Sequence, residues 1–348
     1  MSLLALVLLL RDITYTYDSY NFLCGALSFK EKGRILMCDN SYMTLSPPGF
    51  SVFLSFFLSE AKAISGIYKI STIIVYGLTL ICWINIVKRE LKDYKFIVFA
   101  FLLIAVALPL FYVHLFLWSE GIFLLLFSFG VLSLSNFKEN LLLKWLLLAI
   151  LSFCLSVTVR YAGIVLYILY FTGWIYAQKI KFRREQIFIL CLPLIVTASF
   201  IAVNYFLDNF FFGERPFLNR HFLEILNASL KVICNWMVPI DGITVWFRLL
   251  ILISGLLLLS CYNKNNLPWL LTLVGYFFFI VYSAYMTDIE YDERLFAPVY
   301  PIFIICVFKS LSQLPKTKFT NWGVLLFLIL WTLYSSFRSG KNILMWLN

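Results

Sequence analysis

Residues 96–116 read Phe-Ile-Val-Phe-Ala-Phe-Leu-Leu-Ile-Ala-Val-Ala-Leu-Pro-Leu-Phe-Tyr-Val-His-Leu-Phe and contain no Asp, Glu, Lys or Arg. A run of about twenty apolar residues is long enough to cross the hydrocarbon core of a bilayer as an α-helix. A second run of this kind covers residues 187–207. Strands of a membrane β-barrel alternate in polarity over about ten residues, so these continuous runs predict an all-α transmembrane bundle.

The composition of the whole chain agrees with this prediction. Of its 348 residues, 62% are hydrophobic, 19% are aromatic and only 13% are charged, and the mean hydropathy is +0.90. Soluble proteins carry about a quarter charged residues, so a water-soluble globular protein is excluded. The formal net charge is +10, but no block of five or more Lys or Arg occurs. We therefore expect no nucleic-acid partner and attribute the charge to membrane topology.

Hydrophobic runs separated by short polar joints recur along the chain and predict about 11 spans within one integral-membrane domain, 1–348. The first run, 1–10, is short for a crossing, so either the first span is shortened or the true N-terminus lies upstream. A cleaved signal is disfavoured because no small-residue cleavage site precedes Arg11. The ten later spans are expected at 67–87, 96–116, 121–136, 143–159, 163–178, 187–207, 245–261, 267–287, 297–313 and 321–338.

Basic residues are concentrated in alternate joints, at 88–95, 138–144, 179–186, 262–266 and 309–318. These joints hold half of the 28 basic residues but few of the 18 acidic ones. Because Lys and Arg are enriched in cytoplasmic loops, this side is predicted to be cytoplasmic and the chain to be a multi-pass plasma-membrane protein. Two long loops, at about 11–66 and 208–244, then face the extracytoplasmic side.

The two long outer loops are rich in Phe, Tyr and Leu, which argues against disorder. In the first of them, Ser51, Ser55 and Ser59 recur every four residues within 49–60, with apolar residues between them. This spacing predicts an amphipathic helix that lies along the outer interface. Cys24 and Cys38 share the same loop and could pair in an oxidising compartment.

Ionisable residues avoid the centres of the expected spans. Glu120 and Arg160 lie near outer ends, and Lys144 and Lys309 lie near inner ends. An ionisable residue at mid-membrane is costly and marks a functional site, so the chemistry is predicted at the outer face instead. The lack of midplane carboxylates argues against a proton-coupled transporter, but a flippase with a hydrated groove stays open.

Five short motifs fall on the predicted outer side. They are Asp18 within Thr-Tyr-Asp-Ser-Tyr-Asn, Pro47-Pro48-Gly49, Trp118-Ser119-Glu120, Arg160-Tyr161-Ala162-Gly163 and Asp292-Glu293-Arg294-Leu295-Phe296-Ala297-Pro298. Their order resembles that of the bacterial C-type integral-membrane glycosyltransferases, which include the dolichyl-phosphate-mannose and aminoarabinose transferase-like group. The resemblance covers residues 1 to about 305.

The resemblance implies an enzyme that moves a sugar from a polyprenyl-phosphate carrier to a hydroxyl acceptor, which is a glycan, a lipid or a protein. In that family an acid in the first outer loop is catalytic or orients the acceptor, and Asp18 occupies this position with Tyr20 in its context. Asp12 is the alternative acid. Relatives often carry Asp-Glu where this chain has Asp18-Ser19, so no metal ligand is assigned and a divalent cation is left open as the one candidate cofactor.

The chemistry fits the residue types independently. A sugar hydroxyl is a poor nucleophile near neutral pH, so Asp18 could accept its proton as the hydroxyl attacks the anomeric carbon and inverts it. The leaving lipid phosphate needs cations, and guanidinium groups such as those of Arg160 and Arg294 bind phosphate bidentately. Alternatively, these arginines are snorkelling residues paired with Glu120 or Asp292.

The remaining candidates have several interpretations. Glu120 orients an arginine, binds a sugar hydroxyl or caps the span that follows it. Asp292 joins the substrate-binding set beside Arg294, whereas Pro47 and Pro48 are expected to be structural, since Pro is favoured at a helix start. Two other functions stay open: a flippase for lipid-linked sugar or polysaccharide, and an O-antigen-type polymerase.

Overall fold

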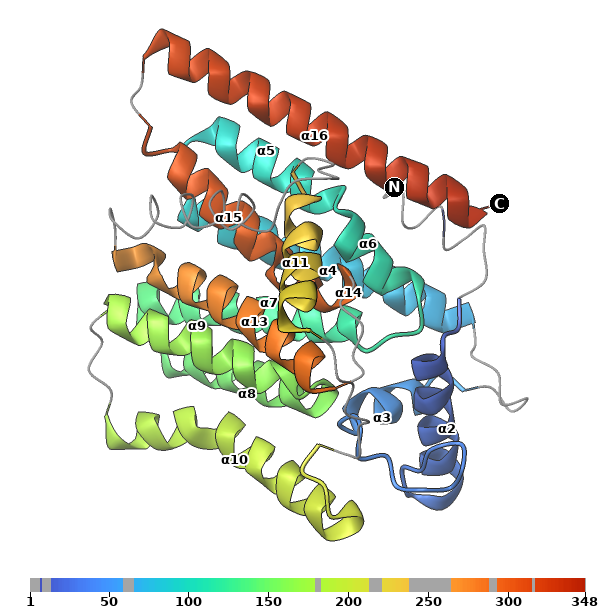
Figure 1. The fold of residues 1–348 in the computed structure, drawn as a ribbon. Helices are drawn as coiled ribbons and strands as arrows, with labels where there is room; N and C mark the ends of the chain where they lie inside the picture. Colours follow the sequence, from blue (N-terminus) through green and yellow to red (C-terminus); the bar gives the residue numbers. More distant parts are fainter. Residues whose placement is uncertain are drawn as a thin grey trace. The chain divides into compact units, whose positions relative to one another are not determined.

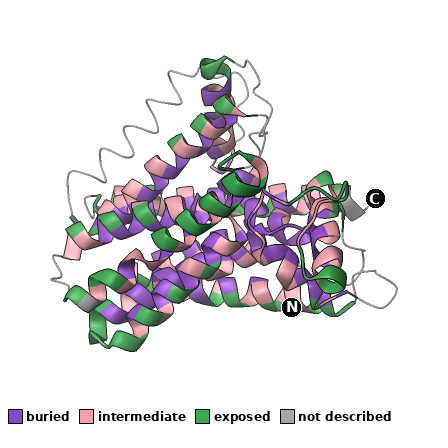
Figure 2. Ribbon diagram, turned by 90° about the horizontal axis from the view of Figure 1, so that it is seen from below, coloured by how far each residue is buried: buried purple, intermediate pink, exposed green. Residues whose placement is uncertain are grey.

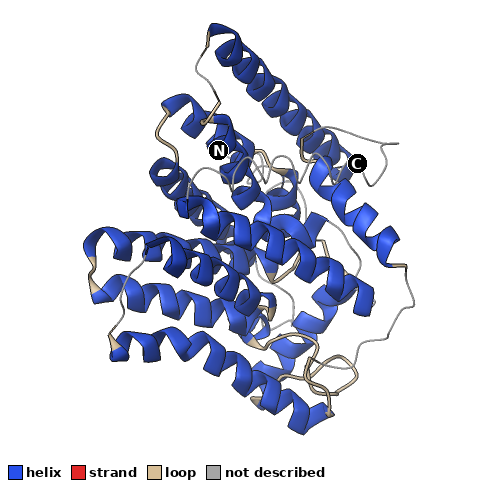
Figure 3. Cartoon of the chain, turned by 60° about the vertical axis from the view of Figure 1, so that its left-hand side comes forward, coloured by secondary structure: helices blue, strands red, loops and turns tan. Residues whose placement is uncertain are grey.

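The structure is a computed structural model that describes Val7 and residues 14–58, 66–178, 183–212, 221–237, 264–287, 293–314 and 317–347. Within these residues the regular structure is helical, and extended pairing is limited to two isolated β-bridges (Figure 3). The predicted all-α class is confirmed.

Figure 1 labels the helices in their order along the chain. Their bounds are α2 Tyr17–Lys32, α3 Gly49–Ser55, α4 Gly66–Glu90, α5 Tyr94–Ala105, α6 Leu108–Leu115, α7 Glu120–Asn140, α8 Leu143–Val159, α9 Ala162–Gln178, α10 Arg184–Asp208, α11 Phe222–Cys234, α13 Leu267–Met286, α14 Glu293–Phe296, α15 Tyr300–Leu311 and α16 Lys318–Leu347, with short 3₁₀ turns at Lys264–Asn266 and Ala297–Val299.

Seven helical segments of the described chain are long and apolar enough to cross a membrane. Two further apolar helices, α8 and α9, have 17 residues each and coincide with the predicted spans 143–159 and 163–178. The predicted spans 1–10 and 245–261 lie outside the described residues, apart from Val7. A multi-pass membrane protein is therefore confirmed, and the count of about 11 spans stays a prediction.

Helix α4 shows how these helices meet lipid. Ile67, Ile70, Ile74, Leu78 and Ile81 are all exposed and recur every three or four residues, so they lie on one helix face. A contiguous exposed apolar face of this kind is unfavourable in water and suits contact with acyl chains. Figure 2 shows buried and exposed positions on opposite faces of many helices, as expected where one face packs and the other meets lipid.

The predicted span 96–116 corresponds to one candidate membrane span, Tyr94–Leu115, which is interrupted by a break between α5 and α6. α5 ends at Ala105 and α6 begins at Leu108. Pro109 has no N–H to donate to the carbonyl of Ala105, and its ring disfavours a continuous helix at that point. Ser339 of α16 donates to the carbonyl oxygen of Val106 at 2.6 Å, so this carbonyl at the break has a partner.

The chain divides into two compact units, each built from three separated stretches. The first comprises Met1–Cys82, Tyr112–Tyr167 and Lys181–Arg215, and the second comprises Trp83–Phe111, Ile168–Ile180 and Pro216–Asn348. In the first unit α7 packs on α8, where a Cβ at Gly130 would lie 2.9 Å from the ring of Phe153. In the second, the indole N–H of Trp331 donates to the carbonyl of Trp236 at 2.7 Å.

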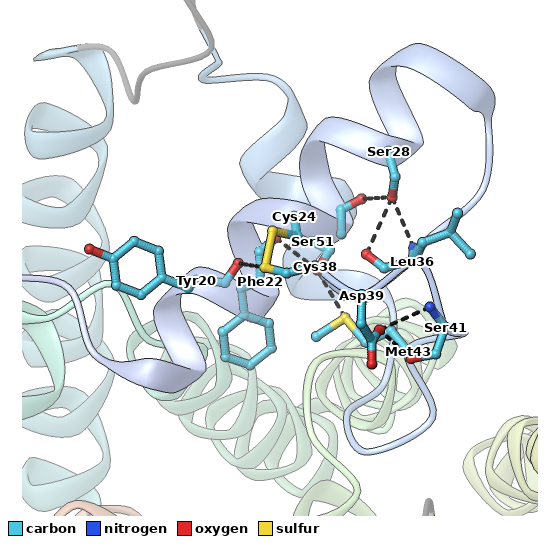
Figure 4. The surroundings of a disulfide bond; sticks show 11 residues. Tyr20, Phe22, Cys24, Ser28, Leu36, Cys38, Asp39, Ser41, Met43 and Ser51 are labelled. Atoms are coloured by element: carbon cyan, nitrogen blue, oxygen red, sulfur yellow. Dashed lines mark hydrogen bonds between the residues drawn. A yellow bond between two sulfur atoms is a disulfide. The ribbon is translucent and has the colours of Figure 1, made fainter.

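The first outer loop folds as a small helical layer closed by a disulfide. Helix α2 ends at Gly33, whose φ of 67° is the left-handed conformation that glycine adopts readily. Cys24 of α2 bonds Cys38 across the returning segment, so the pairing left open by the sequence is present (Figure 4). Ser28 accepts the Leu36 N–H at 2.9 Å and holds the same segment against α2.

Helix α3 begins at Gly49 near the predicted position, but its character differs from the prediction. It ends at Ser55, and both Ser51 and Ser55 are buried. The Ser51 hydroxyl donates to the Phe22 carbonyl of α2 at 3.2 Å. The serine side of α3 therefore packs inside the protein instead of facing water, whereas its position along the outer interface stays a prediction. Ser59 and Glu60 lie outside the described residues.

Candidate functional site

The first turn of α2 carries the candidate base. Thr16 is the N-cap: its Oγ1 accepts the Ser19 N–H at 3.4 Å, and the Ser19 Oγ accepts the Thr16 N–H at 2.9 Å. This reciprocal capping fixes the start of α2 and places Asp18 one residue inside it. Asp18 is half-buried at the helix end where the dipole favours negative charge, and Tyr20 is 56% exposed.

Hydrogen bonds tie the start of α2 to the start of α7. The Trp118 indole N–H donates to Thr16 Oγ1 at 2.8 Å, and the Leu117 N–H donates to the Thr14 carbonyl at 3.2 Å. Thr14 and Phe116 form one of the two isolated bridges, with parallel direction. Two motifs about 100 residues apart, around Asp18 and Trp118, thus meet at one place in the first unit.

A buried ion pair lies at the start of α7. The Glu120 carboxylate pairs with the Arg160 guanidinium, and the two side chains are 3% and 25% exposed. The Nη1 of Arg160 also donates to Ser119 Oγ at 3.3 Å, and Ser119 lies 3.4 Å from Glu120 Oε2. The pairing of Arg160 with Glu120, which the sequence left open, is present. The Glu120 carboxylate is buried with a cation beside it, as a low-dielectric site requires, and Arg160 is half-buried.

Arg160 lies at the end of α8, two residues after the point where the Pro-Pro-Gly motif approaches that helix. It is the C-cap of α8, and its N–H donates to the Ser156 carbonyl at 2.9 Å. Pro48 is the N-cap of α3, and Gly49 is so close to α8 that a Cβ there would lie 2.6 Å from the Thr158 carbonyl oxygen. The motif therefore allows α3 to lie directly on the chain that leads to Arg160.

Replacing Gly49 by Ala is expected to displace α3 from Thr158 and to destabilise the protein by about 1–3 kcal/mol, the usual range for overpacking. The apparent melting temperature of the detergent-purified protein measures this effect. Gly77→Ala is the matched control, because nothing lies within 4 Å of its added Cβ. Equal melting temperatures for the two variants would contradict the close packing at Gly49.

A polar junction beside Arg160 was not identified from the sequence. Asn204 of α10 donates from Nδ2 to the carbonyls of Thr44 and Phe211 at 3.3 and 3.1 Å. Its neighbour one turn on, Asp208, accepts the Thr44 hydroxyl at 2.7 Å. Tyr161 donates to the same Thr44 carbonyl at 3.3 Å. The available signal was the i, i+4 spacing of two polar residues at the end of the apolar run 187–207.

The fifth motif belongs to the second unit. Arg294 is half-buried in α14, and Glu293 forms an ion pair with Arg338 of α16. The partnership of Glu293 was not predicted, because 45 residues separate the two groups. Asp292 lies outside the described residues. Within the part of the chain that is described, no three His, Cys, Asp or Glu residues lie close enough to hold a metal ion.

No protein-family profile and no curated protein sequence matches the chain. Its fold is similar to that of ArnT from Cupriavidus metallidurans in the apo state, with a TM-score of 0.63 and 13% sequence identity. The similarity covers 92% of this chain and 59% of ArnT. ArnT bound to undecaprenyl phosphate matches with a TM-score of 0.59 and 13% identity, over 90% of this chain and 58% of ArnT.

The similarity establishes the fold. ArnT is an aminoarabinose transferase of the C-type class, so the fold implied by the motif resemblance is confirmed. The chain spans about three-fifths of the ArnT length. The roles of Asp18, Glu120, Arg160 and Arg294 stay predictions at this point.

Proposed function

We propose that the chain is a glycosyltransferase that moves a sugar from a polyprenyl-phosphate carrier to a hydroxyl acceptor at the extracytoplasmic face. The observation that carries the proposal is the junction of two helix starts in an ArnT-like fold. One start presents the carboxylate of Asp18, and the other holds the buried pair of Glu120 and Arg160. A base and a phosphate-binding cation are the two groups that this reaction needs.

In the proposed reaction Asp18 accepts the proton of the acceptor hydroxyl while the hydroxyl oxygen attacks the anomeric carbon. The bond from that carbon to the lipid-phosphate oxygen breaks, and the phosphate leaves with its negative charge. Attack from the face opposite the phosphate inverts the anomeric centre. Arg160 stabilises the developing charge, since one quarter of its side chain remains accessible beside its contact with Glu120.

The other candidates have supporting roles in this proposal. Glu120 orients Arg160 through the buried ion pair. Tyr20, which is largely exposed, offers an aromatic face to the sugar. Arg294 and Asp292 of the second unit are proposed to bind substrate, while Pro47 and Pro48 are assigned to structure because Pro47 is buried and Pro48 caps α3.

Two observations support the extracytoplasmic face. The disulfide between Cys24 and Cys38 lies in the layer that carries Asp18, and disulfides persist in oxidising compartments. The basic joints 88–95, 138–144 and 309–318 connect the predicted spans on the side away from the two long loops. Their Lys and Arg content is typical of cytoplasmic loops. A polyprenyl-phosphate donor agrees with the undecaprenyl phosphate bound to ArnT in the similar structure.

The decisive experiment measures the fate of the labelled sugar on the lipid-linked donor. The purified protein in proteoliposomes is given radiolabelled lipid-linked sugars extracted from a strain that lacks this protein, with the envelope of that strain as acceptor. A transferase consumes the lipid-linked sugar, labels the acceptor and releases free polyprenyl phosphate. Movement of the lipid-linked sugar across the bilayer without its consumption would favour the flippase, and lengthening of an existing polymer would favour the polymerase.

A further inference from the structure

A cavity of about 470 Å³ lies in the second unit, whereas Asp18, Glu120 and Arg160 belong to the first. It is formed by the first turns of α5 and α16 and by the end of α15. Its wall combines charged and apolar groups: Asp93, Lys95, Phe96, Leu311, Lys318 and Trp322.

The electrostatics of the cavity favour an anion. Asp93 is the N-cap of α5: its Oδ1 accepts the Lys95 N–H at 3.1 Å, and its Oδ2 lies 3.9 Å from Lys95 Nζ. One ammonium therefore balances the one carboxylate of the wall. Lys318 is exposed and makes no ion pair with any residue that the structure describes, so it adds a net positive charge.

The two helix starts add to this positive potential. Helix α16 is capped by Thr317, whose Oγ1 accepts the Thr320 N–H at 3.1 Å, and it continues for 30 residues. Helix α5 begins at the same cavity. Each helix N-terminus carries a partial positive charge and exposed N–H groups, which favour phosphate-like ligands.

The remaining wall is suited to an acyl chain. Leu311, Val324 and Leu325 line the cavity together with the ring of Trp322, which is 70% exposed. Phe319, on the same turn of α16, is 88% exposed. Exposed aromatic rings beside lysines at a helix end are typical of the membrane–water interface. The cavity thus presents cations and apolar surface together.

We infer that this cavity binds an anionic phospholipid of the surrounding leaflet, with the headgroup phosphate between Lys95 and Lys318 and one acyl chain along Trp322 and Leu325. A cavity between transmembrane helices that is lined by lysines favours acidic headgroups. The joints 88–95 and 309–318, which contribute to its wall, are predicted to be cytoplasmic. The inferred ligand is therefore a lipid of the cytoplasmic leaflet, whereas the proposed donor is used at the extracytoplasmic face.

The test measures lipid binding by native mass spectrometry of the whole detergent-purified protein titrated with phosphatidylglycerol. Lys95→Gln/Lys318→Gln is expected to weaken binding about 25-fold, since each of the two lysines near an anionic lipid contributes about a factor of five in affinity. The matched control is Lys138→Gln/Lys144→Gln, which removes two exposed lysines from the same predicted side, outside the cavity. The control is expected to bind as the unmodified protein does.

Three results would overturn the inference. The first is an equal loss of binding in both double variants, which would indicate a general basic surface. The second is binding of phosphatidylcholine as tight as that of phosphatidylglycerol. The third is binding of glycerol 3-phosphate as tight as that of the lipid, which would indicate a soluble phosphate ligand. Sugar transfer is measured in parallel, so failure of this inference is distinguishable from failure of the proposed function.

Discussion

Replacing Asp18 by Asn is expected to lower sugar transfer by a factor of about 10² to 10⁴, the usual contribution of a general base. Asn keeps the shape of the side chain and its place in the first turn of α2, but it cannot accept the proton of the acceptor hydroxyl. The expected phenotype is a loss of turnover with unchanged donor binding and unchanged melting temperature. The proteoliposome assay measures the turnover, and a strain that carries the variant should fail to restore the missing envelope glycan.

Two controls make the Asp18 prediction specific. Asp39→Asn changes an acid in the same outer layer, where Asp39 accepts hydrogen bonds from Ser41 at an exposed turn, and it should retain full transfer. Asp12→Asn tests the alternative acid. Full restoration of the glycan by the Asp18 variant would refute its assignment as the base, and a selective loss in the Asp12 variant would transfer that role to Asp12.

Replacing Arg160 by Met is expected to destabilise the protein by about 3–5 kcal/mol, because it leaves the carboxylate of Glu120 buried without its cation. In a protein of this size the apparent melting temperature should fall by an amount on the order of 5 °C. Scanning fluorimetry in detergent measures the shift. Transfer should also fall, because the proposed phosphate contact is lost.

The exposed fractions of the Glu120 and Arg160 side chains predict that the two single variants lose different amounts of stability. Glu120→Gln should cost less stability than Arg160→Met, because the Arg160 side chain is 25% exposed and can reach water, whereas Glu120 is 3% exposed. The double variant Glu120→Gln/Arg160→Met should recover much of the stability lost in Arg160→Met. A double variant no more stable than Arg160→Met would show that the buried charge of Glu120 is not the cause.

Much of the fold follows from hydrophobic length alone. Runs of about twenty apolar residues have few alternatives to a membrane-spanning helix, because backbone groups must be satisfied within the segment. The meeting of Asp18, Glu120 and Arg160 within one unit is consistent with the same logic, since polar residues at the outer ends of spans must gather at one face. The sequence already predicts that the motifs around these three residues fall on the same side of the membrane.

Details that depend on contacts between distant segments were not predictable. The hydrogen bond from Trp118 to Thr16 joins residues 102 positions apart. A Trp or a Thr at the end of a predicted span is common at a membrane interface, so neither residue type indicates this partner. The serine period of 49–60 predicts a helix but not what covers each face, and here the Phe22 carbonyl accepts from Ser51. The break at Val106 had a local signal in Pro109, which the long apolar run concealed.

The 17-residue length of α8 and α9 has a consequence for the membrane itself. At 1.5 Å per residue each helix rises about 25 Å, several ångström less than a typical hydrocarbon core. Lipid beside a short span compensates for such hydrophobic mismatch by thinning. Arg160 lies at the turn that joins these two helices, so a dimple in the leaflet there would bring lipid phosphates down to the depth of its guanidinium. Under the proposed function, thinning of the bilayer would bring the phosphate of the lipid carrier close to Arg160.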